Sequence, residues 1–332
     1  MWPSPWRRRA PDLVLDIGAE RTRIASLATG DAIDAPTACL RDERTRWRVG
    51  QAAVDAHARD ADHPLTQPLT GEQVRDPEAL RQLLQALIHE LAPRRWPAPT
   101  IVLPRSPDSP GTRELIRAIW GAGGGRTSVV RAGLCLALGA GLEAEPLGSL
   151  LVEVGATHTL AIIVSTGGVA TWSRAPVGVQ HLRSALAHWM RTEHRLALTP
   201  ATLTEVFGKL SLAEGFSGSL RLALPGDQGA TEQLDVDLGA AVGAVRAAAR
   251  PAIAAITELL RATSPQLAAD VHERGMLLAG GGAHLPGLSD LFAHHTGLPT
   301  VVVDQPERCL YRGAIALAER AELLERNVLE VR

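Results

Sequence analysis

The chain of 332 residues is long enough for about two domains. Hydrophobic residues make up 45% and charged residues 21%, which is an ordinary globular composition. The formal net charge of −2 gives no general attraction to nucleic acid, so we expect no nucleic-acid partner. Of the 34 basic residues only Lys209 is a lysine, and it lies in Gly-Lys-Leu. This excludes P-loop proteins, which need Gly-Lys-Ser/Thr, and protein kinases, which need a strand lysine ahead of the catalytic loop.

Cysteines and apolar segments bear on the compartment. Cys39, Cys135 and Cys309 are far apart and show no paired spacing, so we expect reduced thiols, no zinc site and a cytoplasmic protein. The longest apolar stretch, residues 240–260, is interrupted by two arginines and a proline. We therefore expect no membrane-spanning helix.

Residues 1–11 are expected to form a flexible N-terminal tail that is not a signal peptide, since no apolar region follows its arginines. Two tryptophans precede three arginines in this tail: Trp2, Trp6, Arg7, Arg8 and Arg9. Such a segment suits contact with an anionic membrane surface, at about 1 kcal/mol per arginine. The alternative is a frayed tail whose tryptophans have no role.

Two predicted β-hairpins begin the two halves of the chain. In the first, an apolar strand ends in Asp16-Ile-Gly18 and a second strand returns. In the other, a similar strand ends in Glu153-Val-Gly155, again with a returning strand. Two such copies indicate a duplicated α/β domain.

Periodicity predicts the elements that follow each hairpin. The first half has helices at 77–91, 112–120 and 134–142 and strands at 100–103 and 128–130; the second half has helices at 179–196 and 240–260 and a strand before Gly280. Strands that alternate with helices favour a parallel or mixed sheet with helical cover. Residues 208–229 are rich in Gly, Ser and Leu and suggest a variable insert of unknown role.

A third turn lies near the C-terminus, where a short apolar strand leads into Gly280, Gly281, Gly282 and Ala283 and then a helix. Glycines let a backbone approach a ligand closely, and a helix N-terminus favours an anion. The three turns together suggest a nucleotide site, with the hairpins on the phosphates. Asp16 and Glu153 would face Mg²⁺ through its water molecules.

The order of two hairpins and a triple-glycine turn resembles the actin, sugar-kinase and heat-shock-chaperone ATPase superfamily. The closer resemblance is to the MreB/Mbl family of bacterial actins, and it extends from about residue 12 to 319. It is carried by these segments: 49–53, 67–71, 138–142, 263–288, 296–299 and 305–313.

The resemblance implies an actin-like fold, in which two similar domains surround a nucleotide cleft. Domain I would comprise residues 12–146 with 305–332, and domain II residues 147–304. It further implies ATP or ADP with Mg²⁺ in the cleft and self-association into filaments. Other expected partners are morphogenesis proteins and an anionic membrane surface, to which the cytoplasmic protein would attach peripherally.

Both phosphate turns depart from the family pattern. The first, Asp-x-Gly-Thr-x-Asn-Thr in the family, has Ala19, Glu20 and Arg21 after its glycine, so a phosphate-binding hydroxyl is missing. The second, Asp-Ile-Gly-Gly-Gly-Thr-Thr in the family, has Ala156, Thr157 and His158, so two glycines are missing. His158 could replace a phosphate contact or simply cap the turn.

The catalytic and nucleoside positions depart as well. Ala132 stands where the family carries its catalytic glutamate, so nothing obvious orients an attacking water. In the family's Glu-Glu-x-Lys nucleoside motif, Glu205 is kept and Phe207 replaces the lysine. We therefore expect a cell-shape protein that binds ATP with weak or no hydrolysis. The alternatives are a non-hydrolysing actin-fold scaffold and a metabolite kinase of the same superfamily, for which no general-base aspartate is found.

Overall fold

The computed structural model describes residues 10–42, 46–60, 63–93, 98–105, 109–143, 147–166, 168–225 and 231–329. Its contacts divide the chain into two units. Unit 1 lies within residues 1–143 and 308–332, and unit 2 within residues 144–307. Trp2, Trp6 and Arg7 to Arg9 of the expected membrane-contact segment lie outside the described residues.

Unit 1 is built on a five-stranded sheet in the order β3-β2-β1-β8-β9. The strands are β1 (Leu13–Ile17), β2 (Arg21–Ser26), β3 (Ala32–Pro36), β8 (Ile101–Arg105) and β9 (Thr127–Arg131). β1, β2 and β3 pair antiparallel, whereas β8 and β9 run parallel to β1. Two short hairpins accompany the sheet: β4 (Cys39–Arg41) with β5 (Trp47–Val49), and β6 (Leu69–Thr70) with β7 (Gln73–Val74).

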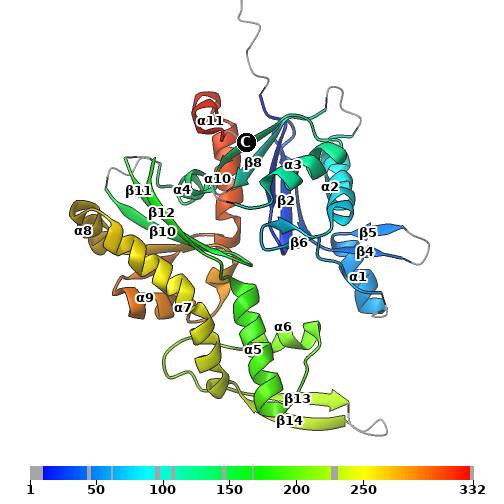
Figure 1. Ribbon diagram of the computed structural model, residues 1–332, viewed down its shortest axis with the longest axis vertical. Coiled ribbons are helices and arrows are strands. Elements are labelled where there is room, and N and C mark those ends of the chain that lie inside the picture. Colours follow the sequence, from blue (N-terminus) through cyan, green and yellow to red (C-terminus); the bar gives the residue numbers. More distant parts are fainter. Residues whose placement is uncertain are drawn as a thin grey trace, which may run out of the picture. The chain divides into compact units, whose positions relative to one another are not determined.

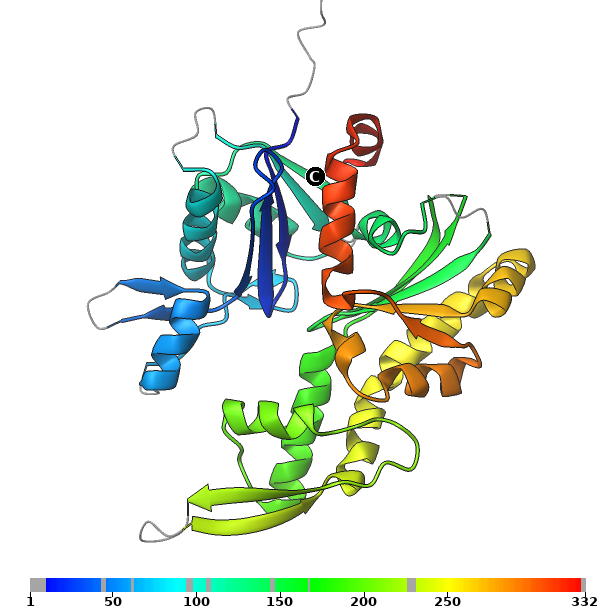
Figure 2. The ribbon, with the colours of Figure 1, turned by 180° about the vertical axis from the view of Figure 1, so that it is seen from behind.

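The helices of unit 1 lie on both faces of this sheet (Figures 1 and 2). They are α1 (Gln51–Arg59), α2 (Pro77–Leu91), α3 (Thr112–Gly121), α4 (Ala132–Gly139), α10 (Cys309–Ala318) and α11 (Ala321–Asn327). The sequence sets the start of α2, since Asp76 accepts a hydrogen bond from the Ala79 amide and Pro77 takes the first position. Leucines at helical spacing bury its inner face.

Unit 2 repeats the same sheet topology, in the order β12-β11-β10-β15-β16. Its strands are β10 (Ser149–Val154), β11 (Thr159–Ser165), β12 (Gly168–Ala175), β15 (Met276–Ala279) and β16 (Thr300–Val302). The first three pair antiparallel and the last two are parallel to β10. The duplication inferred from the two hairpins is thus present in the strand order, and the α/β class is confirmed.

The rest of unit 2 consists of helices, one hairpin and a 3₁₀ turn. The elements are α5 (Val179–His194), α6 (Pro200–Gly208), β13 (Ser219–Pro225), β14 (Thr231–Asp237), α7 (Leu238–Ala262), α8 (Pro265–Arg274), η2 (Gly281–His284) and α9 (Leu288–Thr296); η3 (Pro306–Arg308) leads back to unit 1. Periodicity did not predict α6, and the suggested insert at 208–229 contributes β13, which pairs antiparallel with β14.

Among the described residues, α7 is the one helix long and apolar enough to cross a membrane. Its apolar face packs inside unit 2: nine of its residues are buried, and several of them belong to the hydrophobic core that includes residues of β10 and β11. Pro251 lies within the helix. These contacts are those of a core helix.

Candidate functional site

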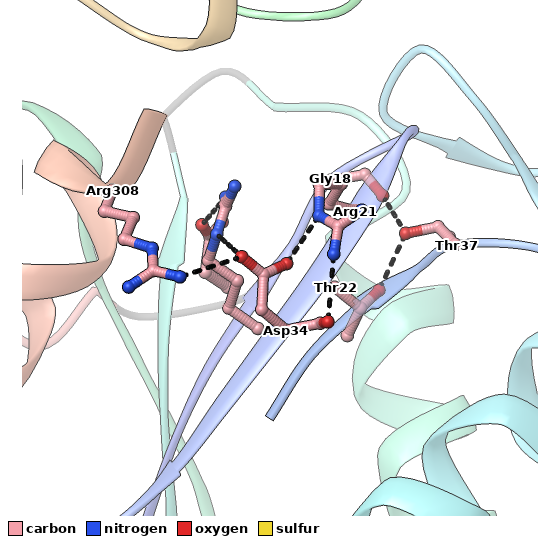
Figure 3. Close-up of polar contacts among 8 residues, drawn as sticks. Gly18, Arg21, Thr22, Asp34, Thr37 and Arg308 are labelled. Carbon is pink, nitrogen blue, oxygen red and sulfur yellow. Dashed lines mark hydrogen bonds and ion pairs between the residues drawn. The ribbon is translucent and has the colours of Figure 1, made fainter. Parts of the chain in front are cut away.

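The first hairpin turn is closed by a backbone hydrogen bond and is contacted by Thr37, which follows β3. The Gly18 amide donates to the Arg21 carbonyl oxygen at 2.9 Å. Thr37 Oγ1 donates to the Gly18 carbonyl at 2.7 Å and lies 2.8 Å from Thr22 Oγ1 (Figure 3). The Thr37 amide donates to the Glu20 carbonyl. Ala19 between them is buried. The turn is therefore rigid, with its conformation fixed by β2 and the segment after β3.

A charged row crosses the sheet next to this turn. Asp16 on β1 pairs with Arg23 on β2, which in turn pairs with Asp34 on β3. Paired residues of an antiparallel ladder share a face, and here the side chains meet. Arg23 Nη1 lies 3.3 Å from Asp16 Oδ2, and Arg23 Nε lies 3.1 Å from Asp34 Oδ2. Only 10% of the Arg23 side chain and 13% of the Asp16 side chain are exposed.

Two further arginines reach Asp34. Arg21 Nε lies 2.6 Å from Asp34 Oδ1, and its Nη2 donates to the Asp34 carbonyl at 2.9 Å. Arg308, just before α10, places Nη2 3.8 Å from Asp34 Oδ2, so that Asp34 lies between Arg21 and Arg308 (Figure 3). We call Asp16, Asp34, Arg21, Arg23 and Arg308 the arginine cluster; it carries three positive and two negative side chains.

The two carboxyl groups respond differently to this environment. Burial raises the pKa of Asp16, and the opposing charges of Arg23 and Arg105 offset only part of that rise. Burial also raises the pKa of Asp34, but hydrogen bonds and charge from Arg21 and Arg23 outweigh it, so the net pKa is lower than usual. Asp34 is thus the carboxylate of the cluster whose ionised form the arginines favour most.

The resemblance implies Mg²⁺ held through water by Asp16 and Glu153, and the surroundings of Asp16 do not fit that ion. Mg²⁺ binds carboxylate oxygens and water with strict geometry. Asp16 is instead engaged by a guanidinium on its own hairpin. Across the described part of the chain, no group of three or more His, Cys, Asp or Glu side chains is placed to hold a metal ion.

The second hairpin repeats the first in its turn. The Gly155 amide donates to the His158 carbonyl at 2.9 Å, as Gly18 does to Arg21. Ala156 and Thr157 complete the turn, and α5 begins directly on it: the Val179 and Gln180 amides donate to the Gly155 and Ala156 carbonyls. A Cβ on Gly178 would overlap this backbone, so the close contact requires glycine there.

The triple-glycine turn crosses the end of the second hairpin. Gly280 has φ 83°, and a Cβ there or on Gly282 would overlap Val154. These two glycines are buried and are explained by packing. Gly281 is different, since it is exposed and a Cβ would meet nothing. Glu153 lies beside Gly280, so the second hairpin and the glycine turn are in contact. Ala283 lies in η2, which the glycine turn begins.

The segment α6 carries the expected nucleoside-contact residues. Glu205 accepts from Lys209 Nζ at 2.8 Å, one helical turn later. Phe207 is 7% exposed and belongs to the unit 2 core, and the Arg183 guanidinium of α5 lies 5.6 Å from its ring centre. Lys209, two residues after Phe207, therefore pairs with Glu205. The guanidinium of Arg183 lies over the Phe207 ring.

At the expected catalytic position, Ala132 is the first residue of α4, directly after β9, and is 5% exposed. A methyl group cannot orient or deprotonate water.

Comparison with known proteins identifies the family. The MreB/Mbl protein family model matches residues 10–326. This chain belongs to the MreB/Mbl family. It is 25% identical to the cell shape-determining protein MreB of Escherichia coli K12 over 327 residues, which cover 91% of each chain. It is 22% identical to the cell shape-determining protein Mbl of Bacillus subtilis, covering 96% of this chain and 99% of the relative.

Solved structures share the fold. MreB5 of Spiroplasma citri bound to AMPPNP superposes with a TM-score of 0.83 at 21% identity, covering 95% of this chain and 98% of the other. A MamK double helical filament gives a TM-score of 0.76 at 18% identity, covering 93% and 99%. The actin-like fold expected from the sequence is thereby confirmed.

Sequence reasoning did not find the arginine cluster as a unit. Asp16 and Arg21 were singled out, but Arg23, Asp34 and Arg308 were not. A signal was available for Arg23, because an arginine in a strand that pairs with the apolar strand before it must face a partner or water. Asp34 and Arg308 carried no such signal. The pairing of β3 with β2 places Asp34 opposite Arg23, and the return of the chain before α10 places Arg308 near Asp34.

Proposed function

We propose that this chain is an actin-like cytoskeletal protein that binds ATP or ADP and takes part in cell-shape determination. The observation that carries the proposal is family membership over residues 10–326. The curated relatives, which are named as cell shape-determining proteins, are matched over nearly their whole length. The sequence offers no general-base aspartate of the kind a metabolite kinase needs, which favours the cytoskeletal function over that alternative.

Nucleotide binding is supported by the MreB5 structures, which are described as bound to ADP and to AMPPNP. In this chain we propose that the turn at Gly18–Arg21 contacts the phosphates in unit 1. In unit 2, the turn at Gly155–His158 and the open Gly281 would contribute. Glu205 and the Arg183–Phe207 pair would lie near the nucleoside.

Hydrolysis is proposed to be weak or absent. Ala132 has no carboxylate, and general base catalysis typically contributes about 10²–10⁴ in rate. This observation favours a second candidate, a non-hydrolysing scaffold that uses the actin fold to hold other morphogenesis proteins.

Self-association into filaments is proposed because MamK, which shares the fold, is described as a double helical filament. A filament requires a head-to-tail contact, in which two different surfaces of the same chain meet. We also propose a cytoplasmic protein whose tail, Trp2 to Arg9, rests on an anionic membrane. Deletion of residues 1–9 should reduce co-sedimentation with anionic liposomes; unchanged binding would reject this role for the tail.

The test of the function is ATP binding, phosphate release and pelleting, measured together on the purified full chain. Binding with slow or no release, and pelleting that depends on nucleotide, is the expected result. Pelleting to the same extent with and without nucleotide would favour the scaffold. Phosphate release that requires an added sugar would overturn both readings in favour of a metabolite kinase.

A further inference from the structure

The two hairpins differ at one cross-strand position. Asp16 and Glu153 occupy the same place in the duplicated sheet, one residue before the last of β1 and β10. Opposite Glu153 on β11 lies Leu160, which is 2% exposed. Opposite Asp16 on β2 lies Arg23. The fold therefore accepts an apolar residue at this position, and the arginine is not a requirement of the hairpin.

A guanidinium at this position competes with a metal ion for the same carboxylate. Arg23 Nη1 is 3.3 Å from Asp16 Oδ2 and is held on its other side by Asp34. A dication bridged to Asp16 through water would lie a few ångströms from this buried positive charge. Like charges repel strongly at such distances when they are shielded from bulk water. Moving Arg23 away would break both of its ion pairs and leave Asp34 to the other arginines.

The cluster suits a phosphate group without help from a metal. Its three guanidinium groups exceed its two carboxylates by one positive charge. Arg21 and Arg308 keep 44% and 48% of their side chains exposed, so both can contact a ligand. Each guanidinium has five N–H donors in a planar fork that matches phosphate oxygens. Arg21 donates to Asp34 through its Nε and Nη2. The turn that we propose as a phosphate contact begins at Gly18, two residues after Asp16.

We propose that Arg23, with Arg21 and Arg308, supplies the positive charge that accompanies a nucleoside di- or triphosphate in unit 1, so that this chain binds the nucleotide without a divalent cation. This inference rests on the proposed nucleotide binding and specifies its chemistry. The arginine cluster thus takes over the charge neutralisation that the family resemblance assigns to Mg²⁺.

The experiment is a titration of the full chain with ATP, followed by calorimetry, in buffer containing MgCl₂ and again in excess EDTA. The affinities are expected to agree within about threefold, since no metal contributes to binding. A loss of about tenfold or more in EDTA would overturn the inference while leaving the proposed function intact. Absence of binding in both buffers would overturn the nucleotide-binding part of the proposed function together with this inference.

Arg23→Leu is the deciding variant, because it copies the Leu160 position of the second hairpin. In EDTA its affinity for ATP should fall about tenfold or more, as for the loss of one charge-assisted interaction. MgCl₂ should restore part of this loss, because the vacated position beside Asp16 then accepts the ion. Unchanged affinity of Arg23→Leu in EDTA would contradict the proposal.

Arg221→Leu is the matched control. Arg221 also pairs with an aspartate directly across an antiparallel hairpin, at 2.8 Å from Asp235, but on β13–β14 and with 66% of its side chain exposed. Its binding should equal that of the wild type in both buffers.

Asp16→Asn is the second variant, for the case that Arg23→Leu does not fold. It keeps the arginines and removes the expected metal contact, so ATP affinity in MgCl₂ should stay the same or increase. A decrease of about tenfold in MgCl₂ that is absent in EDTA would show a metal at Asp16 and overturn the inference.

Discussion

Arg23 lies between two aspartates, with Nη1 3.3 Å from Asp16 on one neighbouring strand and Nε 3.1 Å from Asp34 on the other. This three-strand row sets the charge around the first hairpin. The Asp16 carboxylate, the group most easily assigned to a metal from the sequence, is already neutralised by a side chain of its own hairpin.

Replacement of Asp34 should show how strongly the arginine cluster depends on it. Asp34→Asn removes the charge that three arginines share and leaves Arg23 nearly buried with only Asp16. We expect a loss of about 1–3 kcal/mol in the free energy of unfolding at neutral pH, measured by urea denaturation.

The loss should also depend on pH with a definite sign. The pKa of folded Asp34 lies below its ordinary value of 3.8, so between the two values the unfolded chain binds more protons. The stabilisation is complete above about pH 4–5 and disappears as the pH falls through the folded value. Asp235→Asn, at an exposed pair on β13–β14, is the control and should change little at any pH. Equal stability of Asp34→Asn and wild type at neutral pH would show that the cluster contributes nothing.

Two glycines set the contact between α4 and α10. A Cβ on Gly313 would overlap the Cys135 carbonyl, and one on Gly139 would overlap the Cys309 carbonyl. The helices cannot separate without disturbing the core that they share with β1 and β8. Gly313→Ala should therefore cost at least about 2 kcal/mol in thermal or urea unfolding.

Gly243→Ala is the matched substitution. Gly243 also lies inside a helix, α7, but a Cβ there would meet nothing within reach. Alanine should stabilise this helix by about 0.5–1 kcal/mol. If both variants changed stability in the same direction, close packing of α4 on α10 would not be the cause.

Restoring the family's lysine should not restore a nucleoside contact. Phe207 is buried in unit 2, so Phe207→Lys would remove an aromatic ring from the core and place an ammonium group there beside Arg183. We expect a loss of about 3–5 kcal/mol or failure to fold, measured by circular dichroism. Phe207→Leu should be tolerated far better, because it keeps the site apolar. A folded Phe207→Lys variant of wild-type stability would contradict the core assignment.

The three cysteines should be unreactive in the native protein. All are buried; burial raises the pKa of Cys39 to about 12 and also raises that of Cys135. Cys309 Sγ lies 3.5 Å from the Leu136 carbonyl. Because the thiolate is the reactive form, an aromatic disulfide reagent at about pH 8 should label none of them until guanidinium is added, after which it should label all three. Labelling of native protein at any one cysteine would show that its helix or strand opens locally.

The sequence by itself determined the α/β class, the duplication and the three turns, because these depend on local patterns: apolar strands that end in acid-x-Gly, leucines at helical spacing, and glycines where a backbone must pass closely. It also determined the family, since the motifs at 263–288 and 305–313 match along the chain. It did not predict α6. The β13–β14 hairpin was also missed, although Leu220 and Leu222 on one strand and Leu234 and Val236 on the other alternate as in a half-buried strand.

Only the tertiary structure decided what Asp16 does. The register between β1 and β2 places Arg23 opposite it, the register between β2 and β3 adds Asp34, and the return of the chain before α10 brings Arg308 from nearly 300 residues away. A carboxylate looks the same in sequence whether it faces a cation from solvent or one from its own chain. Its role depends on which charge lies nearest in space, and strand pairing and chain return set that distance.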